Sequence, residues 1–140
     1  MNSRFRQLLR AAFVATLCLL ISAAPSARAA DDPGVSVGLI SIPTGVPSNS
    51  VQQIVAYSLT KREWTVTDKT STKVVGQLKH RGKEAIVTFV FDGKDRLEVY
   101  CSGWKTDRAG KRLKSELPER WIANIKKDVT ARLNQKAAGL

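Results

Sequence analysis

The chain has 140 residues, a formal net charge of +11, one histidine and two cysteines. This length is enough for one small domain and too short for several. Because zinc needs several histidine or cysteine ligands, the composition also argues strongly against a structural zinc site.

Residues 1–29 are typical of a secretory signal peptide. Three arginines within the first ten residues precede an apolar core at residues 11–24, which is shorter than the about 20 residues of a membrane-spanning helix. Ala27 and Ala29 supply the small residues that a signal peptidase recognises, so we expect cleavage after Ala29 and a periplasmic or secreted protein. The alternatives are an uncleaved anchor and a lipoprotein attached at Cys18, where the preceding bulky Leu17 is unfavourable.

Cleavage would leave a basic chain with a single thiol. Four of the 23 basic residues precede residue 30, so 19 remain against 12 acidic ones, a net charge of about +7. Only Cys101 remains, which excludes an intramolecular disulfide. Its apolar neighbours Leu97 and Val99 predict a buried, unreactive side chain.

An extended arm is expected at residues 30–49, ahead of a single folded domain at 50–136 and a short tail at 137–140. The arm carries three prolines and three glycines, which are typical of irregular backbone. Residues 35–42 alternate as an edge strand would, but a flexible lead-in is the simpler interpretation.

The domain is predicted to begin with a short amphipathic helix at residues 50–62. Ser50 and Gln53 fit a capping box at its start. Helical spacing defines a buried stripe made of Val51, Ile54, Val55 and Leu59.

Residues 64–104 alternate between apolar and polar side chains, which predicts a four-stranded antiparallel meander. A two-residue turn at residues 81–82 aligns two of these strands and places Val74 opposite Phe89. The same register pairs Leu78 with Ala85 and Gly76 with Val87, and all six of these residues then share one face of the sheet.

The other two turns are predicted from the same constraint, since a slip by one residue moves every apolar side chain to the other face. A loop with an odd number of residues, such as 92–94, or a bulge is required between the last two strands, and the loop 92–94 places Cys101 beside Ala85. The first turn is expected to place Trp64 over Gly76.

A polar connection after Trp104 leads to a second amphipathic helix, which opens at Pro118. The apolar face of this helix comprises Trp121, Ile122, Ile125, Val129 and Leu133. The predicted fold is therefore α+β, a four-stranded antiparallel β-meander with an N-terminal and a C-terminal helix packed on one face.

Three motifs accompany this order of elements: W-x-V at Trp64, L-x-H-R-G at Leu78 and R-W-I-x-N-I at Arg120. With these motifs, residues 50–134 resemble a group of small bacterial envelope proteins and lipoproteins of unknown function. The resemblance implies the fold and an envelope location, and it implies no activity.

The sequence offers little for catalysis. The single histidine, His80, lies at a predicted turn without a neighbour that would orient it as a general base. Asp92 and Asp95 resemble a calcium loop, but the intervening Lys94 and the missing third carboxylate favour an ordinary turn. We therefore predict a non-enzymatic protein without a cofactor, and a hydrolase centred on His80 is the least favoured alternative.

A basic loop is one candidate binding site. Its cations are Lys105, Arg108, Lys111, Arg112 and Lys114. Such a loop would attract anionic lipid, lipopolysaccharide or another anionic polymer, although runs of charge are more often solvated surface. Nucleic acid is disfavoured, because Trp104 is the only aromatic residue near the loop and the protein is expected to be secreted.

The sheet face that points away from both helices is the second candidate. Its predicted residues Val75, Ile86, Val90 and Tyr100 make it unusually apolar for a wetted face. We expect it to be covered either by arm residues 35–42 or by a second molecule. The sequence thus predicts an envelope interaction module that binds a protein or itself through this face, with anion binding by the basic loop as the alternative.

Overall fold

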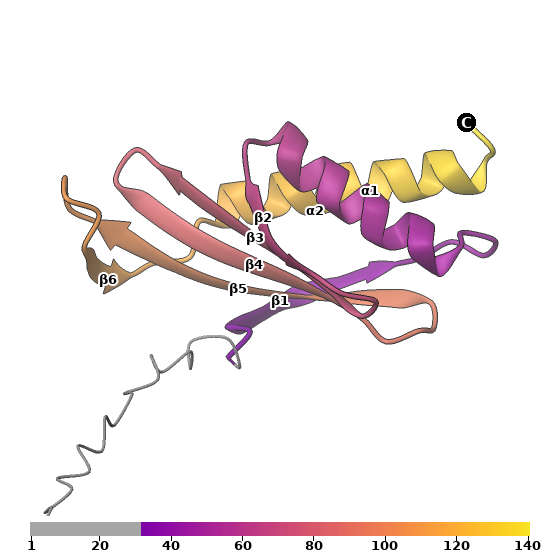
Figure 1. The fold of residues 1–140 in the computed structure, drawn as a ribbon, viewed down its shortest axis with the longest axis horizontal. Coiled ribbons are helices and arrows are strands. Elements are labelled where there is room, and N and C mark those ends of the chain that lie inside the picture. The colour runs from indigo at the N-terminus through magenta and orange to yellow at the C-terminus, as the bar shows by residue number, and fades with distance from the viewer. Residues whose placement is uncertain (1–31) are drawn as a thin grey trace, which may run out of the picture.

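The computed structural model describes residues 32–140, so the predicted signal peptide lies outside the described residues. The elements follow in the order β1 (Val35–Ser41), α1 (Ser48–Lys61), β2 (Thr65–Lys69), β3 (Lys73–His80), β4 (Lys83–Phe91), β5 (Arg96–Thr106), β6 (Arg112–Ser115) and α2 (Glu119–Ala137). Both helices lie on one face of an antiparallel sheet (Figure 1). The predicted α+β class is therefore confirmed.

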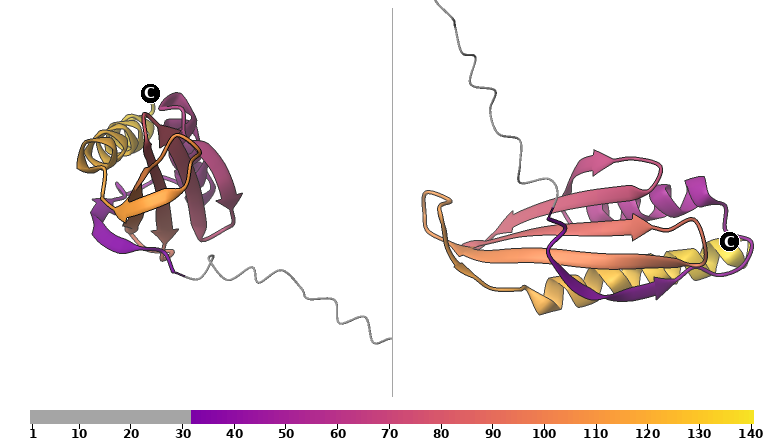
Figure 2. Two further views of the ribbon diagram at one scale, coloured as in Figure 1. Left: turned by 90° about the vertical axis from the view of Figure 1, so that its left-hand side faces the viewer. Right: turned by 90° about the horizontal axis from the view of Figure 1, so that it is seen from below.

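The sheet has six strands, and the prediction of four was wrong. Its order is β1-β5-β4-β3-β2, with β6 also paired to β5. β5 is 11 residues long, and its outer edge is shared by β1 along the first part and β6 along the last part (Figure 2). Because a bare edge exposes unpaired backbone groups, both additional strands satisfy hydrogen bonds that the four-stranded meander would leave open.

β1 arises from the segment that was expected to be a flexible arm. It is anchored by Ile40, which is 3% exposed and belongs to the core, and by Lys126, whose Nζ donates a hydrogen bond to the carbonyl of Val37 at 2.8 Å. β1 thus extends the sheet at its edge, as the alternative of an edge strand had it, and the alternative in which residues 35–42 cover the open face was wrong.

The hairpin of β3 and β4 has the predicted register, with Val74 opposite Phe89 and the turn at Arg81 and Gly82. The hairpin of β4 and β5 does not, because Cys101 lies opposite Val87. The loop between the paired residues Phe91 and Leu97 has five residues, whereas the predicted loop at residues 92–94 had three. A shift of two residues preserves the face, so the buried side of β5 was nevertheless predicted correctly.

The start of the domain differs from the prediction in two ways. α1 begins at Ser48, where Pro47 is the N-cap residue and no side chain caps the helix, so the predicted capping box is absent. Trp64 does not cover Gly76; the side chain of Leu59 does. A Cβ atom on Gly76 would lie 2.9 Å from Cδ2 of Leu59, so glycine is required for α1 to approach β3 this closely.

The core lies between the helices and the sheet. On the helices its fully enclosed residues are Val51, Val55, Leu59, Ile125, Val129 and Leu133. On the sheet they face Ala85, Val87, Phe89, Leu97, Val99 and Cys101. Two residues of the predicted stripes, Ile54 and Trp121, are only partly buried and pack at the margin of this core.

We predict that Gly76→Ala lowers the free energy of unfolding by about 1–3 kcal/mol, because the added methyl group overlaps Leu59. Urea unfolding of Gly76→Ala, Leu59→Ala and the double variant measures this. The double variant should be less destabilised than the sum of the single variants, since Leu59→Ala makes room for the methyl group. Additive losses would contradict the proposed contact.

We predict that Arg81→Asn raises the free energy of unfolding by about 1 kcal/mol. Arg81 has a φ of 48° and Gly82 a φ of 71°, which defines a hairpin turn that favours Asn-Gly and disfavours other side chains at the first position. The matched control is Arg81→Ala, which removes the same charge without suiting the left-handed backbone. Equal stabilities of the two variants in thermal unfolding would contradict this explanation.

Candidate binding surfaces

The outer face of the sheet, meaning the face opposite both helices, carries the predicted interaction residues. Val75, Thr88 and Tyr100 lie side by side across β3, β4 and β5. Ile86 and Val90 flank Thr88 on β4, and both point to the same side. The structure thus brings together all four predicted residues of this face, each of them partly buried.

Leu39 extends this apolar strip in a way that the sequence analysis missed. It lies opposite Glu98 in the β1 to β5 pairing and is 56% exposed. Glu98 itself accepts a hydrogen bond from the hydroxyl of Tyr100 at 2.6 Å, and this bond raises the pKa of Tyr100. Leu39 was missed because its segment was interpreted as a flexible arm.

The charges of the outer face are balanced. Lys73 pairs with Asp68 at 3.0 Å, and Arg112 pairs with Glu84 at 2.9 Å. Lys79 and Glu98 also lie on this face, as does Arg96, which pairs with Asp92 at 3.3 Å. Because the chain as a whole is strongly basic, this balance distinguishes the outer face from the rest of the surface.

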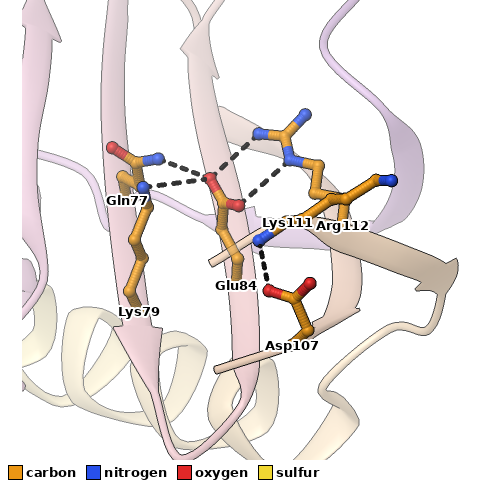
Figure 3. Close-up of polar contacts among 6 residues, drawn as sticks. All are labelled: Gln77, Lys79, Glu84, Asp107, Lys111 and Arg112. Atoms are coloured by element: carbon orange, nitrogen blue, oxygen red, sulfur yellow. Dashed lines mark hydrogen bonds and ion pairs between the residues drawn. The ribbon is translucent and has the colours of Figure 1, made fainter. Parts of the chain in front are cut away.

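Glu84 is a buried charged group of the outer face that several side chains contact (Figure 3). Only 3% exposed, it accepts hydrogen bonds from Nη2 and Nε of Arg112 at 2.9 and 3.0 Å, and from Nε2 of Gln77 at 2.6 Å. The bonds from Arg112 are the main cause of the lowered pKa of Glu84. The guanidinium of Arg112 also lies 3.6 Å above the ring of Trp104, so this arginine is held between an acid and an aromatic ring.

The structure separates the five cations that were predicted to form one anion-binding loop. Arg112 faces the outer side, whereas Lys105 lies on the helix side and pairs with Glu116 at 3.2 Å. Glu116 also binds Lys83 at 2.7 Å, and both lysines lower its pKa. Three of the predicted cations form no ion pair within residues 32–140: Arg108, Lys111 and Lys114.

His80 and Cys101 occupy very different environments. His80 is exposed at the end of β3, and its ring lies edge-on to Trp121 with centroids 6.3 Å apart. Cys101 is 0% exposed, and burial raises the pKa of its thiol to about 12. In the described part of the chain, no three His, Cys, Asp or Glu side chains are grouped closely enough to hold a metal ion.

No helix between residues 32 and 140 is long and apolar enough to cross a membrane. Comparisons with protein family models, curated proteins and solved structures found no match for this chain. The resemblance to small envelope proteins and the envelope location therefore stay predictions.

We predict that Cys101 does not react with a thiol reagent in the folded protein. Its labelling should require unfolding, because the thiol is buried and its raised pKa leaves almost no thiolate at neutral pH. Labelling rates with and without urea, followed by mass spectrometry, measure this. Rapid labelling without denaturant would contradict the position of Cys101 in the core.

We predict that Glu84→Gln lowers the free energy of unfolding by about 1–3 kcal/mol at neutral pH, because a neutral acceptor holds Arg112 less strongly. The pKa of Glu84 is lowered in the folded state, so its stabilising effect is present above the unfolded-state pKa and is lost as pH falls through the folded-state pKa. The difference between variant and parent should therefore shrink below about pH 4.5.

Urea unfolding at several pH values tests this dependence. Asp95→Asn provides the control, because Asp95 is exposed and forms no ion pair among residues 32–140. A loss in Glu84→Gln that is unchanged from neutral to acidic pH would show that the charge of Glu84 contributes nothing.

Proposed function

We propose that the protein is a non-enzymatic interaction module of the bacterial envelope, which binds a partner protein or a second copy through the outer face of its sheet. The observation that carries this proposal is the strip of Val75, Ile86, Val90 and Tyr100, which is flanked by balanced charges and lies on the face without helices. An apolar centre within a polar rim is the usual anatomy of a protein interface.

The charge pattern favours a protein over an anionic polymer at this face. Arg112, one of the five cations of the predicted basic loop, is already neutralised by Glu84. The strip also has the composition of an interface, because tyrosine and aliphatic side chains bury area without costly desolvation of charge. The sheet packs against two helices through its other face, which supports these side chains from behind (Figure 1).

Site-specific photo-crosslinking in the native host tests the proposal. A benzophenone side chain at position 90 should yield an adduct of discrete mass that contains a second polypeptide, either another protein or another copy of this chain. The same side chain at position 57, on the exposed helix side, is the control and should yield no such adduct. Ile86→Lys should reduce the adduct at position 90 by about tenfold, because it places a charge in the centre of the strip.

Three outcomes would contradict the proposal. Equal adducts from positions 90 and 57 would show random collisions. Adducts without peptide would favour the alternative function, in which anionic lipid or polymer binds the protein. The absence of adducts at position 90 would show that the outer face is exposed to water in the cell.

A further inference from the structure

A groove on the helix side of the sheet concentrates positive charge that the outer face lacks. It lies where the turn between β3 and β4 approaches the start of α2, at the same end of the sheet as β6 (Figure 1). A pocket of about 510 Å³ and a smaller one of about 180 Å³ are both lined by His80 and Trp121. We call these two pockets together the His80 groove.

The larger pocket is cationic. Arg81, Lys83 and Arg120 line it, with Glu119 as the only acid among the lining residues. Lys83 is bound to Glu116, but neither Arg81 nor Arg120 forms an ion pair with any residue from 32 to 140. Two guanidinium groups are thus free to bind an oxyanion, and their planar geometry suits this task.

The smaller pocket is less charged and more apolar. Trp64 and Leu78 line it, and its one arginine, Arg62, is occupied by Asp128 at 2.7 Å. Trp121 lines both pockets and meets Trp64 edge-to-face with ring centroids 6.3 Å apart. The groove therefore has a cationic end and a less charged end, and the aromatic side chain of Trp121 lines both.

The wall of the groove is rigid. Pro118 packs on Gly103 of β5, where a Cβ atom would lie only 2.7 Å from Cδ of Pro118 and 2.5 Å from the carbonyl oxygen of Glu116. This contact seats the start of α2 directly on the sheet. Arg81 and Glu63, the non-glycine residues with positive φ within the described range, line the larger and the smaller pocket respectively. Such strained residues concentrate at binding sites.

We propose that the His80 groove binds a small ligand in which an oxyanion group, a phosphate or a carboxylate, is attached to an aromatic ring. The oxyanion contacts Arg81 and Arg120, and the ring lies against Trp121 towards Leu78. This site is independent of the outer face and does not rest on the function proposed for it, because the sheet lies between the two.

Nuclear magnetic resonance with phenyl phosphate tests this proposal. The chain has three tryptophans, whose indole N–H signals report on separate places. Phenyl phosphate should shift the signals of Trp121 and Trp64 in a saturable manner at about 0.15 M salt and leave Trp104, on the outer face, unchanged. Inorganic phosphate and phenol should each bind at least about tenfold more weakly, because each offers half of the ligand.

Charge variants separate the groove from general attraction by a basic protein. Arg120→Gln and Arg81→Asn should each weaken phenyl phosphate binding at least about fivefold. Arg81→Asn is the sharper variant, because it preserves the turn and should fold at least as well as the parent. Arg108→Gln, which removes the same charge from the tip of the β5 to β6 hairpin, should leave binding unchanged.

Each remaining outcome would overturn the proposal. Unsaturable shifts, or shifts of Trp104 alone, would exclude the groove as the site. Equal losses in Arg108→Gln and Arg120→Gln would reveal unspecific charge attraction. If phenol bound as tightly as phenyl phosphate, the oxyanion would have no role in binding. If inorganic phosphate bound as tightly as phenyl phosphate, the ring would have no role.

Discussion

The turn at Arg81 and Gly82 aligns β3 with β4, and this alignment determines which side of the sheet each residue occupies. Ala85, Val87 and Phe89 of β4 point to the helices, so the even-numbered residues between them point away. Because side chains alternate with a period of two, β5 and β2 inherit this assignment from β4 and β3. The core, the outer face and the cationic end of the groove therefore all depend on one hairpin.

Much of this arrangement could be predicted from the sequence, because independent local signals agreed there. The turn residues and the apolar alternation both point to the register of β3 and β4. For β5 the alternation alone was available, and it defines a face but not an absolute register. A loop of five residues and one of three leave Val99 and Cys101 equally buried, so the pattern could not show that Cys101 lies beside Val87.

What could not be predicted depends on contacts between distant segments. The pairing of β1 and β6, each of which carries a bulge, depends on the free edge of the long β5. The alternation of residues 35–42 allowed an edge strand, but only the contact with β5 distinguishes that strand from a flexible lead-in. Glu84 and Arg112 are separated by 28 residues, and nothing in either local sequence indicates that they meet. Likewise, the sequence identified Gly76 as a place of close approach. It did not indicate that the side chain filling this place would be Leu59 of α1.

The acidic residues determine where the excess positive charge of this protein remains available. Glu84 binds Arg112 on the outer face, and Glu116 binds Lys83 and Lys105 on the helix side. The same short segment that carries Glu116 then continues into Pro118, which packs on Gly103 and forms the wall of the His80 groove. Among residues 32–140, the cations of the groove that form no ion pair are therefore Arg81 and Arg120. Since the sheet separates the two surfaces, a partner on the outer face and an anionic ligand in the groove would not compete for the same side chains.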